Sequence, residues 1–119
     1  MKNENLFERP WGHYFNALEE TGFKIKKIVV KPNSRLSLQS HEKRSEHWVV
    51  VQGSALVTLD DKEINMERDQ YIYIPKGSIH RLQNLGSDDL ILVEVQLGTY
   101  LGEDDIKRYQ DDYNRLSEK

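Results

Sequence analysis

The sequence contains no cysteine among its 119 residues. This absence excludes disulfides, iron–sulfur clusters and thiolate metal sites, so any metal must be held by histidine, carboxylate or amide side chains. The amino-terminal stretch "MKNENLFERPWG" lacks a long apolar run, so neither a signal peptide nor a membrane span is expected. Both absences fit a reducing compartment, and we expect a cytoplasmic protein that does not bind membranes.

The chain also lacks an excess of one charge, with 17 basic and 20 acidic residues and a net charge of −3. A nucleic-acid-binding domain usually carries a concentrated basic patch, so no nucleic-acid partner is expected. The length is that of one domain, and we expect a single domain over residues 1–119.

Short apolar segments separated by Gly, Pro, Asn and Asp run through residues 23–98. Short strands at this spacing indicate an all-β sandwich or barrel. The expected strands are 23–31, 36–41, 47–53, 54–59, 70–75, 79–84 and 90–98.

The two ends of the chain differ from this pattern. Residues 1–22 are expected to form an amino-terminal arm, with a turn at 9–12 and an edge strand at 13–18. Residues 102–116, "GEDDIKRYQDDYNRL", begin with three acids, which are favourable at a helix amino terminus. Their apolar residues recur at helical spacing, which predicts a short carboxyl-terminal helix packed on the sheet: Ile106, Tyr109, Tyr113 and Leu116.

Four polar side chains form a candidate metal-ligand set. Gln39 and His41 are two apart and would share one face of a strand. Glu46 begins the next expected strand, and His80 begins a later one after "PKG". If these strands are neighbours in a barrel, an amide oxygen, a carboxylate and two imidazoles converge, a set that suits Zn, Mn, Fe, Co or Ni. The alternative is polar decoration of a strand surface.

The stretches "QSHEKRSEHWVVVQG" and "PKGSIHRLQN" together resemble the two motifs of the cupin superfamily. This resemblance implies a double-stranded β-helix, or jelly-roll, barrel whose metal is held by ligands from both motifs. The sequence departs from the superfamily pattern at Gln39, where a histidine is usual, and at Asp69, where a glycine usually opens the second motif. An amide oxygen in place of an imidazole should weaken the affinity for Zn and broaden the choice of metal.

A closer resemblance covers residues 8–115, on phrases such as "LSLQSH", "EHWVVV" and "EDDIKR". The chain is similar to the type II mannose-6-phosphate isomerase domain, normally the carboxyl-terminal half of a two-domain enzyme whose other half is a mannose-1-phosphate guanylyltransferase. This resemblance implies interconversion of mannose 6-phosphate and fructose 6-phosphate, with a divalent metal, foremost Zn, on the four candidate ligands. No Gly-rich nucleotide-binding loop is present, so GDP-mannose synthesis is not expected.

Other residues are candidates for proton transfer and for binding the phosphate. Arg108 in "EDDIKR" matches an arginine implicated in substrate handling in the family, whereas by spacing alone it is a solvated helix residue. Lys26 and Glu94 each share a strand face with apolar residues and are candidate catalytic groups, or else a strand-end lysine and an ion-paired glutamate. Three cations are candidates for binding the phosphate: Lys26, Arg108, and Arg44, which is expected in the turn beside the site.

Two other functions remain open at this point. One is a non-catalytic cupin module that binds a sugar or sugar phosphate and acts with a separate sugar-nucleotide enzyme, and the other is a metal-dependent oxygenase.

His47 alternates away from Glu46 and is expected on the opposite face, while Trp11 and Trp48 are expected to pack. Exposed strand edges favour a homodimer.

Overall fold

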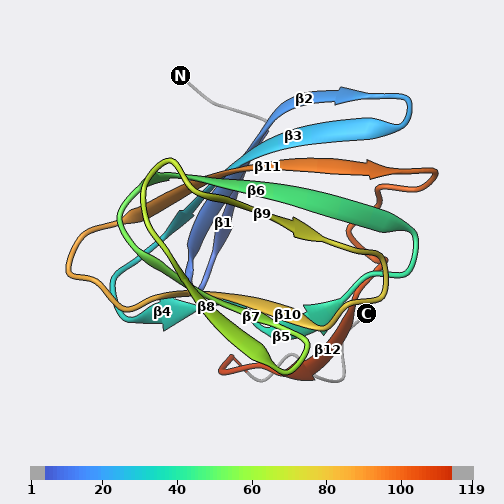
Figure 1. Cartoon of the computed structure of the whole chain (residues 1–119). Helices are drawn as coiled ribbons and strands as arrows, with labels where there is room; N and C mark the ends of the chain where they lie inside the picture. The colour runs from blue at the N-terminus through green and yellow to red at the C-terminus, as the bar shows by residue number, and fades with distance from the viewer. Residues whose placement is uncertain (1–4, 114–119) are drawn as a thin grey trace.

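The computed structural model describes residues 5–113 (Figure 1). These residues form only strands, turns and loops. The strands are β1 (Leu6–Arg9), β2 (Gly12–Glu20), β3 (Phe23–Val30), β4 (Ser34–Arg35), β5 (Leu38–Ser40), β6 (Arg44–Gln52), β7 (Ala55–Leu59), β8 (Lys62–Met66), β9 (Tyr71–Ile74), β10 (His80–Asn84), β11 (Leu90–Gly98) and β12 (Lys107–Gln110).

The strands form two antiparallel sheets that face each other as layers (Figure 1). One sheet has the order β1-β2-β3-β11-β6-β9. The other has the order β12-β5-β10-β7-β8, and β4 pairs with β10 beside this path. Neighbours such as β3 and β11 are far apart in the sequence, and this is the crossed connectivity of a jelly roll. The predicted all-β barrel is therefore confirmed.

Within the described part of the chain, the structure adds strands that the sequence patterns did not indicate, among them β1, β8 and the two-residue β4. β1 is short and pairs only with β2, so β1 is the edge strand, and the expected edge strand at 13–18 is an inner one. β8 begins with the charged residues Lys62 and Glu63, which do not indicate a strand. β1 and β8 are exposed on much of their surface, which weakens the alternation that marks a strand.

The predicted carboxyl-terminal helix is wrong over the described residues. Lys107–Gln110 is the extended strand β12, which pairs with β5 and places Arg108 opposite Gln39. The pairing satisfies backbone groups of β5 that would otherwise be exposed at a sheet edge, and Tyr109 contributes a side-chain contact to Ser40. Tertiary pairing thus overrides a weak local helical pattern. Leu116, the last residue of the expected stripe, lies outside the described residues.

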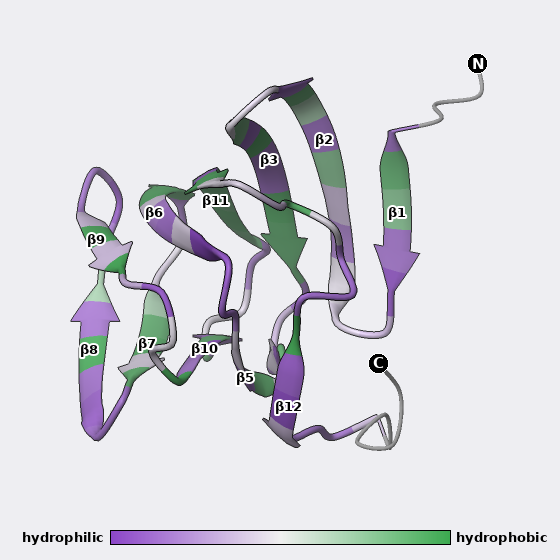
Figure 2. Cartoon of the chain, turned by 90° about the vertical axis from the view of Figure 1, so that its right-hand side faces the viewer, coloured by the Kyte–Doolittle hydropathy of each residue, from purple (hydrophilic) through white to green (hydrophobic). Residues whose placement is uncertain are grey.

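The inner faces of β3, β6 and β11 are apolar at one end of the barrel. Leu90 and Leu92 of β11 are fully buried and pair in register with Val30 and Ile28 of β3. Figure 2 shows β3 turning to hydrophobic residues toward its arrowhead, where this core lies. Burying side chains of this size contributes about 1.5–3 kcal/mol each, so this half of the barrel stabilises the fold.

The other end of the same inner faces is polar although it is equally buried. Glu94 and Gln96 follow Leu92 on the inward face of β11, and they pair in register with Lys26 and Lys24 of β3. On β6, Glu46 pairs with Gln96 across the sheet. Buried polar groups cost stability unless they are hydrogen-bonded, so their concentration at one end of the barrel indicates a functional site.

Candidate metal centre and pocket

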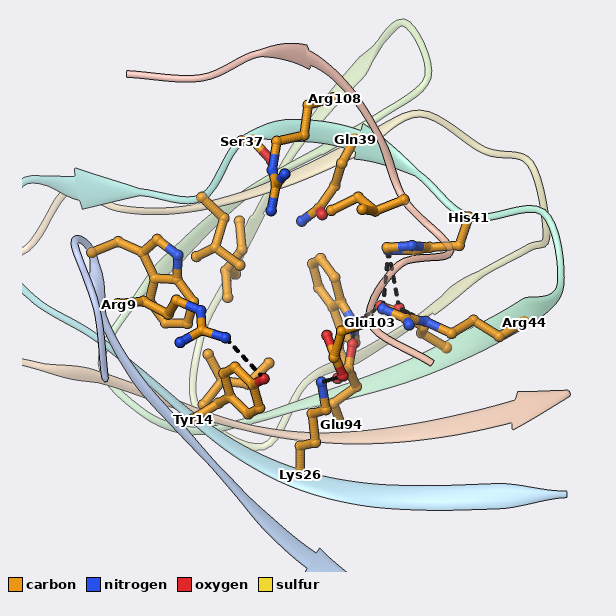
Figure 3. Close-up of a pocket in the computed structure, with 17 residues that line it drawn as sticks. Arg9, Tyr14, Lys26, Ser37, Gln39, His41, Arg44, Glu94, Glu103 and Arg108 are labelled. Atoms are coloured by element: carbon orange, nitrogen blue, oxygen red, sulfur yellow. Dashed lines mark hydrogen bonds and ion pairs between the residues drawn. The ribbon is translucent and has the colours of Figure 1, made fainter. Parts of the chain in front are cut away.

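A pocket opens at the polar end of the barrel, between the two sheets (Figure 3). It encloses about 650 Å³ of space, part of which is open to solvent. Its walls come from β1, β2, β3, β5, β6, β11 and the segment before and within β12. Its lining combines apolar side chains with a few charged ones, as small-molecule sites do.

Three of the four predicted ligands lie together beside this pocket, and two of them, His41 and Glu46, line it. His41 follows β5, Glu46 lies on β6 and His80 begins β10, and all three are buried. One ligand atom from each lies within 4.8 Å of the others. The His41 Nε2–Glu46 Oε2 distance is 3.4 Å, and the His80 Nε2–Glu46 Oε1 distance is 4.0 Å. These separations fit donors that share one ion at about 2.0–2.2 Å from each.

Both histidines are oriented as metal ligands usually are. The Nδ1 atom of His41 is 2.7 Å from the Asp105 carbonyl, and the Nδ1 atom of His80 is 2.9 Å from the Ser78 carbonyl. A carbonyl only accepts, so Nδ1 carries the hydrogen in each ring and the Nε2 lone pair faces Glu46. The His80 Nε2 atom is buried without a hydrogen-bond partner among the described residues.

The charge states of this cluster also suit a cation. Burial, reinforced by the charge of Arg44, lowers the pKa of His41 to about 3, and burial lowers the pKa of His80. The pKa of Glu46 is lowered. Burial alone would raise this pKa, but the positive charge of Arg44 and the hydrogen bonds from Glu94, Arg44 and Trp48 have a larger effect in the opposite direction. Two neutral imidazoles and one carboxylate therefore face each other, and neutral imidazole and carboxylate are the forms that bind metal.

Gln39 lies beside the cluster, on the strand pair that carries His80. Gln39 and His80 are directly opposite in the β5–β10 pairing, and Gln39 is opposite Arg108 on its other side. Residues directly opposite share a face of the sheet. Gln39 and Arg108 both extend into the pocket in Figure 3, so the structure places the fourth predicted ligand beside the other three.

Glu94 lies deeper in the pocket wall and is held by two donors. The Trp48 Nε1 atom donates to Glu94 at 3.2 Å and to Glu46 at 2.9 Å, and the Gln96 amide donates to Glu94 at 2.9 Å. Burial, with the nearby Glu46 carboxylate, raises the pKa of Glu94 to about 7. Trp48 is thus buried as expected, and it also links the two carboxylates.

Arg44 is not a solvated turn residue. It is the first residue of β6, it is only 5% exposed, and its Nε atom donates to Glu46 Oε2 at 2.8 Å. Its Nη2 atom donates to His41 Nε2 at 3.2 Å. The structure therefore places this predicted phosphate ligand within the candidate metal centre.

Lys26 points into the pocket, where it meets residues that the sequence patterns did not single out. Its Nζ atom is 2.6 Å from the half-exposed carboxylate of Glu103 and 4.1 Å from the ring centroid of Tyr14. Arg9 lies over the same ring and donates to the Tyr14 hydroxyl at 3.3 Å. In the sequence, Glu103 is one of the three acids that begin the expected helix, and Arg9 begins the expected turn at 9–12. Neither position indicates a pocket residue.

The structure also locates His47 and Trp11. His47 is on the outer face of β6, as the strand alternation requires, and its ring is tilted against that of Tyr73 with 4.9 Å between the ring centroids. Trp11 belongs to the buried core. Neither His47 nor Tyr73 lines the pocket.

A two-sheet jelly roll with a buried His–Glu–His group at its polar end defines the cupin class. Among solved structures, the Cnp3 cupin domain of Schizosaccharomyces pombe aligns with a TM-score of 0.70 and 15% identity, covering 72% of this chain and 64% of that one. This likeness concerns the fold. The family described as "Mannose-6-phosphate isomerase C-terminal" matches residues 1–111, and the chain belongs to that family.

Curated relatives are much longer than this chain. The alginate biosynthesis protein AlgA of Pseudomonas aeruginosa is 52% identical over 110 residues, which are 92% of this chain and 23% of AlgA. A mannose-1-phosphate guanylyltransferase of Sinorhizobium fredii is 49% identical over 104 residues, covering 87% of this chain and 20% of that protein. The chain therefore spans about a fifth of the length of these relatives. Within residues 5–113, no helix has both the length and the apolar character that a membrane crossing needs.

Proposed function

We propose that this chain is a metal-dependent sugar-phosphate isomerase that interconverts mannose 6-phosphate and fructose 6-phosphate. The observation that carries the proposal is the His41–Glu46–His80 cluster, which borders a pocket that also holds the cations Lys26 and Arg108. Family membership supports the choice of substrate. The cluster and the cations supply the two things that this substrate needs, a site for the reacting sugar oxygens and a site for the phosphate.

Gln39, His41, Glu46 and His80 would hold the metal. The buried, unpartnered Nε2 atom of His80 and the neutral His41 ring fit a divalent ion. A bound ion would supply Lewis-acid polarisation of the sugar oxygens. Zn is the first candidate for this donor set, and Mn, Co, Ni and Fe also fit because one donor is an amide oxygen.

Glu94 is our candidate for moving the proton between C1 and C2 of the sugar through an enediol. It is the pocket carboxylate that lies outside the ligand set and beside it, held by Trp48 and Gln96. Glu103 is the matched control, since it is a pocket carboxylate paired with Lys26. Glu94→Gln should lower kcat by about a hundredfold or more, and Glu103→Gln should change kcat much less. Equal losses in kcat would contradict the assignment.

Lys26 and Arg108 are proposed to bind the phosphate and to position the sugar beside the ligand cluster. The phosphate would take over Lys26 from Glu103, whose carboxylate is the same kind of partner. Arg108 presents the planar donor fork that suits phosphate. Arg108→Ala should spare metal content and raise the KM for sugar phosphates, and an unchanged KM and kcat would remove Arg108 from the site.

The deciding experiment measures fructose 6-phosphate formed from mannose 6-phosphate by chelator-stripped protein, before and after addition of Zn²⁺, Mn²⁺, Co²⁺ or Ni²⁺. Turnover restored by a metal is the expected result. The specific alternative is a non-catalytic sugar-phosphate-binding module, which the same pocket cations would serve without turnover. Folded protein that takes up metal and binds mannose 6-phosphate without turnover would support that alternative.

We further propose a cytoplasmic homodimer. The lack of cysteine supports the location. An exposed apolar patch lies on the outer face of β6 and β9 and consists of Val49, Val51, Tyr71 and Tyr73. In the described structure, β9 is the last strand of its sheet. Because this patch contains no charged side chain, a two-fold-related copy can meet it without opposed like charges. Val49→Lys should give a monomer in light scattering, whereas Leu85→Lys, at an exposed apolar residue in the β10–β11 loop, should not. A Val49→Lys protein of unchanged mass would exclude this face.

A further inference from the structure

Arg44 occupies the lone pair that a metal would need. His41 donates its Nδ1 hydrogen to the Asp105 carbonyl at 2.7 Å. The neutral ring therefore has a single lone pair, on Nε2. That lone pair now accepts the Arg44 Nη2 hydrogen at 3.2 Å. One lone pair cannot serve a guanidinium donor and a metal ion at the same time.

The same guanidinium also holds the second ligand. The Arg44 Nε atom donates to Glu46 Oε2 at 2.8 Å, so one side chain contacts two of the three clustered ligands. An ion bound to His41 and Glu46 would lie within a few ångströms of this positive charge, and the two cations would repel each other strongly at that distance.

Two atoms of this cluster are among the buried polar atoms that have no hydrogen-bond partner within the described residues. They are Arg44 Nη1 and His80 Nε2. An unsatisfied buried group is costly, so the centre with Arg44 in place is not its best-satisfied state. A metal ion would satisfy His80, and movement of Arg44 into the adjoining pocket would bring its free donors to water or to an anion.

We propose that Arg44 and a divalent metal compete for His41 and Glu46, and that the displaced guanidinium becomes a binding group for the substrate's phosphate. Arg44 already lines the pocket, as do Lys26 and Arg108 (Figure 3). Metal binding therefore prepares the phosphate site. The inference rests on the proposed metal centre, and it does not require that the chain turn a sugar over.

The proposed role of Arg44 couples the binding of metal to the binding of a dianion. If the metal frees Arg44 for a dianion, the dianion in turn holds Arg44 away from the ligands and strengthens metal binding by the same factor. Removal of the guanidinium should strengthen metal binding and should abolish this coupling. The two effects have different readouts, and neither is catalytic activity.

The first measurement is the affinity for Co²⁺, followed by its visible absorption. Arg44→Met should bind Co²⁺ roughly ten- to a hundredfold more tightly than the wild type, because hydrogen bonds to charged groups contribute net stabilisation of that order. Arg9→Met is the matched control, since Arg9 contacts Glu8 and Tyr14 and none of the clustered ligands. Its Co²⁺ affinity should be unchanged. Unchanged or weaker binding by Arg44→Met would overturn the competition, because it would make Arg44 a supporting partner of the metal ligands.

The second measurement uses sulfate as a tetrahedral dianion. Wild-type protein should bind sulfate more tightly with Co²⁺ than without it, by about five- to 150-fold, and Arg44→Met should lose the difference. Coupling that persists in Arg44→Met would show that sulfate binds the metal directly, and it would overturn the role of Arg44.

A third measurement does not depend on a variant that folds. In wild-type protein, titration with diamagnetic Zn²⁺ should shift the nitrogen-15 NMR signal of the Arg44 Nε–H group as its bond to Glu46 breaks. A signal that stays in place at metal saturation would overturn the proposal. A protein that shows all three binding effects but no turnover would refute the isomerase and leave the inference about Arg44 intact.

Discussion

Asp105 is expected to control metal affinity although it is not a ligand. Its carboxylate accepts backbone hydrogens from Glu42 at 3.1 Å and from Lys43 at 3.0 Å, and its carbonyl accepts the Nδ1 hydrogen of His41. The side chain thus fixes the position of the backbone group that orients the imidazole. Asp105→Ala removes the two carboxylate contacts and leaves the carbonyl on a loosened segment.

The magnitude follows from these contacts. Hydrogen bonds to a carboxylate contribute up to about 1.5–3 kcal/mol each, and because these lie near solvent we expect a total loss of about 1–2 kcal/mol in the free energy of unfolding. Groups that orient a metal-binding histidine typically change metal affinity by about 10–100-fold. Asp105→Ala should therefore weaken Co²⁺ binding by at least about tenfold.

The assay is a Co²⁺ titration combined with urea unfolding of the metal-free protein. Asp104→Ala is the matched control, because this neighbouring acid bonds to the Tyr100 hydroxyl and contacts no backbone group near His41 in the described structure. The control should retain the wild-type Co²⁺ affinity. If Asp105→Ala and Asp104→Ala bind Co²⁺ equally well, the segment does not orient His41 and the reasoning fails.

Substitutions at three further positions test the site and the fold. Gln39→His should bind Zn²⁺ more tightly, because an imidazole replaces an amide oxygen; weaker Zn²⁺ binding in calorimetry would remove Gln39 from the ligand set. Asn84→Ala should cost about 2–4 kcal/mol in urea unfolding, since the buried amide makes three hydrogen bonds. Asn84→Asp should cost more, because a carboxylate cannot donate to the Val30 and Asp88 carbonyls; equal costs would contradict this. Asp69 has φ of 80°, so Asp69→Gly should raise the thermal midpoint by relieving about 1–2 kcal/mol of strain, which exceeds the extra backbone entropy that glycine loses on folding; a lower midpoint would refute it.

The strands with inner and outer faces in strict alternation could be predicted from sequence. β11 was expected at residues 90–98 and lies at Leu90–Gly98, because its inward side chains are all buried. His80 could be placed at the start of a strand because the Pro75–Gly77 turn precedes it, and His41 could be placed at the end of one because a charged stretch follows it. The glycine that is usual at the position of Asp69 has a structural reason, since φ is positive there and glycine adopts positive φ more readily than other residues.

Other parts of the site depend on contacts that no local pattern reveals. Glu103 and Asp105 look like acids that begin a helix, yet one pairs with Lys26 and the other orients His41. Their roles arise because β12 joins the edge of the second sheet, and this is a pairing between segments far apart in the sequence. Arg44 looked solvated because charged neighbours surround it in the sequence, but the strand begins at Arg44 and turns its side chain inward.

The division of the barrel into two halves explains how so polar a site is maintained. On β11, Leu92 and Glu94 are successive inward residues, and both are at most 4% exposed. A register slip of one residue would expose both of them at once, so the apolar half that fixes the register also fixes the polar half. The buried carboxylate of Glu94 cannot relax toward solvent without unpairing β11 from β3 and β6. The hydrophobic core therefore holds the polar groups in place before any ligand arrives, and such preorganisation is what a site for metal and phosphate requires.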